Sequence, residues 1–285
     1  MKQIINIFYS VLLIFTAVAC QSETPHERIL MVSIPPQKYV LDQIVGDKFT
    51  VECMLRNAAS AESYDPEMSQ IMLLEKSDAY FFIGNLPFER VVDKKLSDLG
   101  KDDRKFHSEK GIKLICGHHH HGEVDEHEFD PHVWMSVNNM RIIARNMTDA
   151  VCHIDSANAH FYRQRLNALD LRLDSLANAT ATKLKGYEGK AFVVWHPSLS
   201  YFAADYGLHQ ISMEYEGKEA PIGQIQHRLK EAQEMKASVF FAQEGGDENK
   251  ALAICRQARL RSVTINPLSE DWINEFTKIT DELAK

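Results

Sequence analysis

The hydrophobic pattern from Arg28 onward alternates between short apolar runs and stretches with helical spacing. The apolar runs predict four strands, at Ile29–Ile34, Lys48–Leu55, Ala79–Ile83 and Gly111–Ile115. The stretches between them each contain a proline suited to the first turn of a helix, and they predict helices at Pro36–Val45, Pro66–Lys76 and Pro87–Leu99. Such a βαβ series predicts a parallel sheet with helices on both faces.

A second series follows a polar interruption. A helix is predicted at Val137–Cys152, and the next stretch, Ser156–Lys185, contains neither Gly nor Pro. Its apolar side chains recur at spacings of four and three, which predicts one helix of about 45 Å with a single apolar stripe. Beyond it, strands are predicted at Lys190–Trp195, Leu208–Met213, Ser238–Ala242 and Ser262–Ile265. Helices are predicted at Ser198–Tyr206, Pro221–Lys236, Asp247–Arg259 and Ser269–Ala284.

These elements predict an α/β fold of two (β/α) lobes with mainly parallel sheets, joined by a long rigid helix. We expect the N-terminal lobe to cover residues 28–153, the linking helix 156–185 and the C-terminal lobe 188–285. The length suits this division, because each lobe has enough residues for its own core.

The first 19 residues have the pattern of a secretory signal, with Lys2 followed by an apolar run. The run ends at Ala17-Val18-Ala19-Cys20, which is typical of a bacterial lipoprotein signal cut before a cysteine that is then lipidated. We therefore expect Cys20 to anchor the protein to a membrane surface in the cell envelope, whether inner or outer. Ordinary cleavage and a soluble secreted protein is the alternative.

Net charge limits the binding partners that we expect, and cysteine content limits the possible disulfide bonds. The formal net charge is −8 at pH 7 and becomes one unit more negative without Lys2, so nucleic acid is not an expected partner. We expect a monomer. Four cysteines remain after Cys20 and could form two disulfides in three pairings, between which the sequence does not choose: Cys53, Cys116, Cys152 and Cys255.

Histidine is concentrated in one polar segment, with six of the 13 histidines between positions 118 and 132. Neutral imidazole is a common ligand of zinc and copper, so a tract of this kind predicts metal capture. A solvated loop without a role is the alternative. We expect the loop 117–128 to form a weaker auxiliary metal site through His118, His119, His120, His121 and His127.

Candidate ligands also follow the predicted strands, where open α/β sheets bind ligands. Glu62 follows the second strand, His132 follows the Gly111–Ile115 strand across the His-rich loop, and His196 comes directly after Trp195. Three further polar residues end later strands: Gln243, Glu244 and Asn266. Because the first two ligands belong to one lobe and the others to the second, all can converge on the cleft between the lobes.

Motifs around these residues resemble those of the bacterial metal receptors for ABC importers, the zinc and manganese uptake (ZnuA/TroA-like) family. The matching motifs include Glu62-Ser63-Tyr64-Asp65-Pro66, Asp130-Pro131-His132-Val133-Trp134, Trp195-His196-Pro197 and Asn266-Pro267-Leu268. They occur in the family's order over nearly the whole chain. An acidic, His-rich insertion before the Asp-Pro-His motif is characteristic of the zinc-importing members.

The resemblance implies a metal bound between two lobes and delivered to the permease of an ABC importer. Three family ligand positions fall on Glu62, His132 and His196. The first of these is usually His, and the last family position, commonly Asp, is Asn266 here. Glu244 is a candidate fourth ligand.

Zn²⁺ is the expected metal, because the Irving–Williams order favours it over Mn²⁺ and Fe²⁺, although the oxygen of Glu62 would suit all three. An exported zinc hydrolase, with Glu62 or Glu244 as general base, is the alternative from another class. A lipoprotein used for adhesion or for supplying other metalloproteins is the third interpretation.

Overall fold

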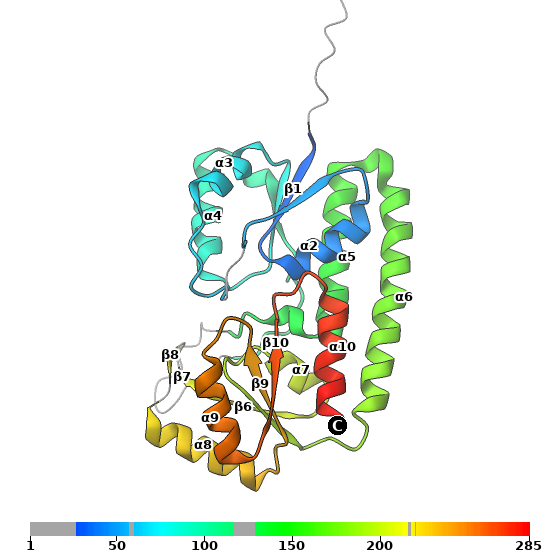
Figure 1. The fold of residues 1–285 in the computed structure, drawn as a ribbon. Coiled ribbons are helices and arrows are strands. Elements are labelled where there is room, and N and C mark those ends of the chain that lie inside the picture. The colour runs from blue at the N-terminus through cyan, green and yellow to red at the C-terminus, as the bar shows by residue number, and fades with distance from the viewer. Residues whose placement is uncertain (1–26, 57–59, 117–128, 216–217, 220) are drawn as a thin grey trace, which may run out of the picture.

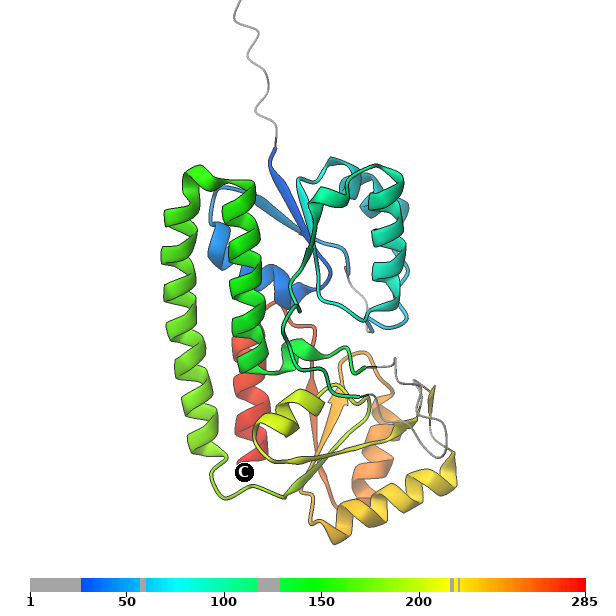
Figure 2. The same ribbon diagram turned by 180° about the vertical axis from the view of Figure 1, so that it is seen from behind.

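The computed structural model describes residues 27–56, 60–116, 129–215, 218–219 and 221–285. They form two lobes, each built on a four-stranded parallel sheet, and a long helix runs beside both lobes (Figures 1 and 2). The predicted two-lobe α/β class is therefore confirmed.

The sheet of the N-terminal lobe has the order β2-β1-β3-β4, with every neighbouring pair parallel. Its strands are β1 (Ile29–Val32), β2 (Thr50–Cys53), β3 (Ala79–Phe82) and β4 (Lys105–His107). Its helices are α2 (Pro35–Val45), α3 (Met68–Lys76) and α4 (Pro87–Asp98). Prolines occupy the first turns of α2 and α4, as predicted, because a helix start needs no N–H there.

The prediction of a strand at Gly111–Ile115 is wrong. The fourth strand is β4, which pairs with β3 and stacks Phe106 on Phe81 at 5.6 Å between ring centroids. Its neighbours in sequence are charged, as suits an edge strand, so no apolar run signalled it. The side chains of Ile112, Leu114 and Ile115 instead pack against the core without joining the sheet.

The long linking helix is present. A 3₁₀ turn, η3 (Ser156–Asn158), separates α5 (Val137–Ile154) from α6 (Ala159–Lys183), so the predicted helix begins three residues late. The 25 residues of α6 extend about 37 Å. Its predicted apolar stripe is buried at Tyr162, Leu169, Leu173 and Leu176. The helix packs on α2 of the first lobe and on α10 of the second.

The sheet of the C-terminal lobe has the order β10-β9-β5-β6 and is also parallel throughout. Its strands are β5 (Ala191–Val194), β6 (His209–Ser212), β9 (Val239–Gln243) and β10 (Arg261–Ile265). Its helices are α7 (Ser200–Asp205), α8 (Ile222–Glu234), α9 (Glu248–Ala258) and α10 (Trp272–Leu283). The sequence did not predict a short antiparallel pair, β7 (Glu214–Tyr215) with β8 (Lys218–Glu219).

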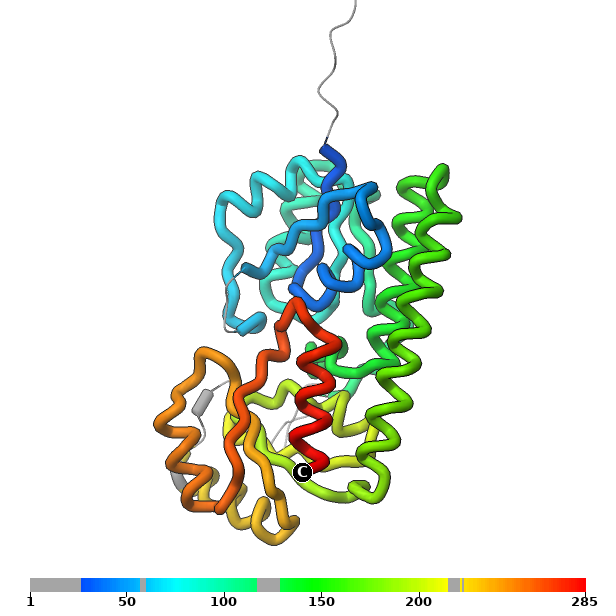
Figure 3. Tube along the Cα trace, turned by 45° about the vertical axis from the view of Figure 1, so that its right-hand side comes forward, coloured from blue at the N-terminus to red at the C-terminus, as the bar shows by residue number. Residues whose placement is uncertain are grey.

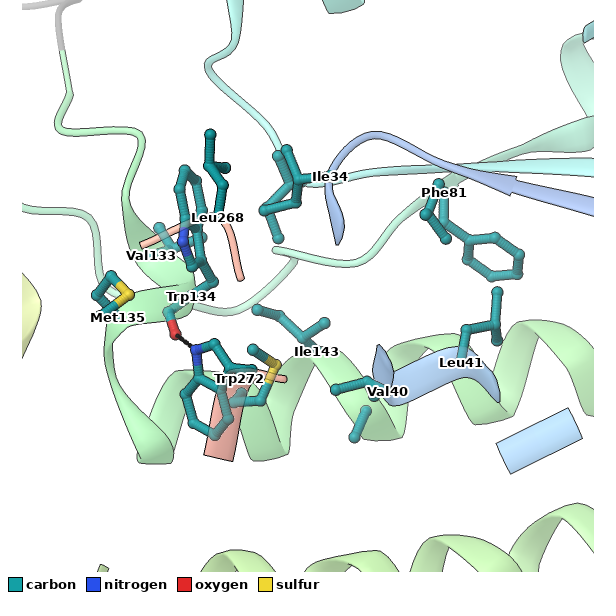
Figure 4. Packing of buried hydrophobic residues seen from close by; sticks show 14 of the residues in the cluster. Ile34, Val40, Leu41, Phe81, Val133, Trp134, Met135, Ile143, Leu268 and Trp272 are labelled. Carbon is teal, nitrogen blue, oxygen red and sulfur yellow. Dashed lines mark hydrogen bonds between the residues drawn. The ribbon is translucent and has the colours of Figure 1, made fainter. Parts of the chain in front are cut away.

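One hydrophobic core continues from the first lobe into the second. Figure 4 shows Trp134, from the 3₁₀ turn η2 (Val133–Met135), beside Trp272 of α10. The indole N–H of Trp134 donates to the carbonyl of Pro267 at 2.8 Å, and that of Trp272 donates to the carbonyl of Trp134 at 3.1 Å. Buried indole groups that are packed and hydrogen-bonded across the lobes restrain the lobes against wide opening.

The chain enters the described structure at the end of the N-terminal lobe that lies away from the C-terminal lobe (Figure 3). No helix among the described residues is both long enough and apolar enough to cross a bilayer. The four cysteines predicted as candidates for disulfides are free thiols, three of them buried and Cys116 exposed.

Candidate metal centre

Three predicted ligands meet in the cleft. Glu62 lies between β2 and α3, His132 directly precedes η2, and His196 follows β5. The Nε2 atoms of the two histidines are 3.2 Å apart, and Glu62 Oε1 lies 3.4 Å from Nε2 of His196 and 3.9 Å from Nε2 of His132. Within the described ranges, these are the residues whose potential ligand atoms cluster within 4.8 Å of one another.

These separations match a tetrahedral metal site. A tetrahedron with metal–ligand bonds of about 2.0–2.1 Å has edges of about 3.3–3.4 Å. The distances of 3.2 and 3.4 Å fit two such edges, and the third pair, at 3.9 Å, is about half an ångström longer. Two imidazoles and one carboxylate are donors that zinc accepts, so both the chemistry and the spacing of the residues fit a small divalent metal ion.

A short motif fixes the orientation of His132. Asp130 Oδ1 accepts hydrogen bonds from the backbone N–H of His132 at 2.8 Å and from its ring Nδ1–H at 2.9 Å. The hydroxyl of Tyr201 donates to the carbonyl of Asp130 at 2.9 Å, which ties this motif to the C-terminal lobe. Burial favours the neutral acid, but His132 beside it holds the pKa of Asp130 below its usual range. With Nδ1 occupied in this way, Nε2 faces the cleft.

Glu214 orients His196 in the same way, although the sequence interpretation did not identify it. Its Oε2 lies 2.6 Å from Nδ1 of His196, and its backbone N–H donates to the carbonyl of Trp195 at 3.0 Å. Burial lowers the pKa of His196, but the hydrogen bonds to Glu214 and Glu62 outweigh it and raise that pKa to about 9. Glu214 lies two residues after the end of β6 at Ser212, so the rule that ligands gather at strand ends could have found it.

Glu62 is the most accessible of the three predicted ligands, with about a third of its side chain exposed (32%). Ser60 Oγ accepts its backbone N–H at 3.2 Å, and nearby Tyr64 donates to the carbonyl of Met54 at 2.9 Å. Burial raises the pKa of Glu62, but His196 and His132 more than compensate and hold it below the usual value. The carboxylate is therefore charged and ready to bind a cation at neutral pH.

The other predicted ligands lie outside this cluster. Glu244 Oε2 accepts a hydrogen bond from Asn266 Nδ2 at 2.8 Å, and Asn266 Oδ1 accepts the backbone N–H of Leu268 at 2.9 Å. Asn266 therefore stabilises its own turn and positions Glu244. Gln243 lines the same cavity as Glu244. The predicted auxiliary ligands His118, His119, His120, His121 and His127, and the predicted anchor Cys20, fall outside the described residues.

A cavity of about 420 Å³ opens beside the three ligands. Its lining includes Glu62, His196, Glu214, Gln243 and Glu244. His132 is not among its lining residues and is buried, whereas Glu62 and His196 line the cavity directly. A metal ion could therefore reach the cluster through this cavity.

Comparison with known proteins is consistent with this geometry. Residues 30–285 match the family described as zinc-uptake complex component A, periplasmic (ZnuA). The chain belongs to this family. A curated relative, the zinc-binding lipoprotein AdcA of Streptococcus pneumoniae, is 26% identical over 98% of this chain. The chain spans just over half (57%) of the length of AdcA.

Solved structures agree on the fold. A crystal structure of ZnuA superposes with a TM-score of 0.81, at 26% identity, over 90% of this chain and 98% of that one. A ZnuA deletion mutant with zinc bound gives the same TM-score at 27% identity, over 90% of this chain and 97% of that one. A manganese-bound periplasmic metal-binding protein of Candidatus Liberibacter asiaticus shares the fold at 18% identity, with a TM-score of 0.76 over 90% of this chain and all of that one.

Proposed function

We propose that this protein is an extracytoplasmic zinc receptor that captures Zn²⁺ and delivers it to the permease of an ABC-type importer. The observation that carries the proposal is the convergence of Glu62, His132 and His196 at tetrahedral spacing. In this proposal zinc is cargo, bound without turnover and released to the membrane partner.

The two orienting carboxylates support zinc as the metal. A ligating imidazole that donates its other N–H to a carboxylate is held in one tautomer and is more basic, which strengthens binding to zinc. Both histidines have such a partner, in Asp130 and Glu214. Mn²⁺ or Fe²⁺ is the second candidate, because Glu62 adds oxygen to the ligand set, but two imidazoles and the Irving–Williams order favour zinc.

We propose that, in the absence of any other ligand, Glu244 or solvent completes the coordination of the metal. Glu244 lines the cavity beside the triad, so a change of side-chain conformation would be needed to bring its carboxylate to the metal. An exported hydrolase would instead need a metal-bound water and a general base at this position. The match to the ZnuA family favours the receptor.

The chain outside the described core has its own proposed roles. We propose that residues 1–19 are a signal peptide and that lipidated Cys20 anchors a monomeric receptor in the cell envelope. The described chain starts at the lobe end away from the other lobe, so such a tether would leave the cleft accessible (Figure 3). The division into 28–153, 156–185 and 188–285, and the role of loop 117–128 as a weaker zinc site, are parts of the same proposal.

Zinc titration in the presence of a competing chelator tests the function. We expect one tight equivalent in the wild-type protein and its loss in His132→Ala and in His196→Ala. His209→Ala is the matched control, because His209 is exposed on β6 in the same lobe as His196 and lies outside the cluster. Unchanged tight binding in both cluster variants would refute the site. Zinc-dependent hydrolysis of peptide or ester substrates by the loaded protein would favour the enzyme.

A further inference from the structure

The metal cluster leaves one coordination position without a ligand from the described residues. Zinc in proteins is usually tetrahedral, whereas the cluster supplies three donors: Glu62, His132 and His196. Glu244 stands nearby but is held by Asn266. The fourth vertex of the bound metal is therefore available to a molecule from solution.

The cavity that adjoins two of the three predicted ligands is much larger than a water molecule. The cavity lined by Glu62 and His196 has a volume of about 420 Å³, whereas one water occupies about 30 Å³ in the liquid. Cavities of a few hundred cubic ångströms are the usual size of small-molecule sites. The room exceeds what one metal ion and one water need, and it matches a molecule the size of an amino acid.

The walls of the cavity offer three kinds of contact. Trp195 supplies an aromatic side chain, Ser60 and Ser63 supply hydroxyl groups, and Glu244 supplies a carboxylate. Hydrogen-bonding to Asn266 holds this carboxylate in place. A hydroxyl can donate to a carboxylate of a ligand, while the carboxylate of Glu244 attracts an ammonium group.

Charge selects among the small molecules that bind metals. Glu62, Glu214 and Glu244 all line the cavity, so three carboxylates stand against the two positive charges of one zinc ion. An anionic chelator such as citrate would meet net repulsion there. A zwitterion that carries an ammonium group and a neutral metal-binding nitrogen would not.

We propose that the zinc-loaded cleft binds a zwitterionic amino acid with a second metal donor, of which histidine is the type, as the fourth zinc ligand. Its imidazole would replace water on the open vertex, its ammonium group would face Glu244, and its carboxylate would face the hydroxyls of Ser60 and Ser63. The cargo is then zinc together with one amino acid. The inference rests on the proposed zinc-binding function.

Equilibrium dialysis of radiolabelled L-histidine against the protein tests this, with zinc buffered so that the tight site stays saturated. We expect one equivalent of histidine on the zinc-loaded protein and none on the metal-free protein, with bound zinc retained. Failure to bind zinc at all would sink the proposed function. Zinc binding without histidine binding, or histidine that only strips the zinc, would overturn this inference alone.

Analogues and one variant test the contacts. Imidazolepropionate lacks the ammonium group, so it should bind the wild-type protein about two- to fivefold more weakly than histidine does, as expected for the loss of one exposed ion pair. Glu244→Gln removes the partner of the ammonium group, so this variant should bind histidine more weakly by a similar factor. Citrate should not bind. Glu248→Gln is the matched control, because Glu248 is exposed in the first turn of α9 and outside the cavity. Equal histidine binding by the two variants, or citrate binding as tight as that of histidine, would contradict the proposed orientation.

Discussion

Replacement of Glu214 by glutamine should weaken zinc binding in a manner that depends on pH. Glu214 Oε2 lies 2.6 Å from Nδ1 of His196 and touches no proposed metal position itself. Glutamine keeps an oxygen that can accept the Nδ1–H but removes the negative charge. The imidazole then becomes a poorer zinc ligand, and it also binds its own proton less tightly.

The weaker zinc ligand lowers the apparent zinc affinity, whereas weaker competition from protons raises it. Only the second effect depends on pH, so measurements at two pH values separate them. Burial lowers the pKa of His196, but Glu214 and Glu62 raise it to about 9, so at pH 7 about one metal-free molecule in a hundred has the neutral ring. Proton competition therefore weakens zinc binding about a hundredfold at pH 7 and little above pH 9. Loss of an orienting carboxylate costs about 10- to 100-fold in metal affinity. The variant should show this full loss at pH 9 and a smaller loss at pH 7.

Chelator-competition titrations at half-unit steps from pH 6 to 9 measure both terms. For the wild-type protein, apparent zinc affinity should rise by about tenfold from pH 7 to 8 and by about fivefold from pH 8 to 9, and the variant should show a shallower rise. Glu234→Gln, an exposed change on α8 of the same lobe, is the control and should follow the wild type. Parallel curves for Glu214→Gln and wild type, or no loss at pH 9, would refute the role given to Glu214.

Three further predictions concern other parts of the chain. Glu62→His should keep one tight zinc equivalent and lower Mn²⁺ affinity relative to Zn²⁺ in competition titrations, because it exchanges an oxygen donor for nitrogen; a variant that prefers Mn²⁺ would argue against Glu62 as a ligand. Deletion of His118–His121 should remove weak zinc equivalents and leave the tight one; loss of the tight one would make the loop the principal site. Burial raises the pKa of Glu89 from 4.5 to about 7, so the folded protein favours the protonated form of this side chain. The contribution of Glu89 to the free energy of unfolding is therefore complete below pH 4.5 and is lost as pH rises through 7. The free energy of unfolding of the metal-free protein should therefore fall by about 3 kcal/mol over this interval from this group, and Glu89→Gln should flatten the pH curve; an unchanged curve would contradict this.

The fold could be predicted where a residue pattern has one physical cause. The buried runs at Ile29–Val32 and Ala191–Val194 are apolar on both faces because both sheet faces are covered, and the stripe on α6 repeats because one helix face packs against both lobes. The strand Lys105–His107 could not be found in this way. It lies at a sheet edge, where polar residues are tolerated, and the nearby apolar alternation serves the core instead.

The convergence of Glu62, His132 and His196 could be predicted from the sequence, whereas the hydrogen bonds that orient them could not. Glu62 and His196 follow β2 and β5, so the strand-end rule places them at one cleft. His132 follows no strand, because the predicted strand Gly111–Ile115 does not form, and its Asp130-Pro131-His132 motif is what marked it. The position of Glu214 after β6 could be inferred, but its pairing with His196 could not, because no hydrophobic pattern marks the short β7–β8 ladder on which Glu214 lies. The hydrogen bond between Glu244 and Asn266 depends on the register of β9 with β10. The sequence of each strand alone does not define that register.

A crystal structure of the protein grown with zinc, with anomalous data collected on both sides of the zinc absorption edge, tests the central claim most directly. The account predicts one strong zinc peak in the cleft, about 2.0–2.2 Å from Oε1 of Glu62 and from Nε2 of His132 and of His196. A strong peak bound elsewhere on the protein, with these three side chains unliganded, would contradict it.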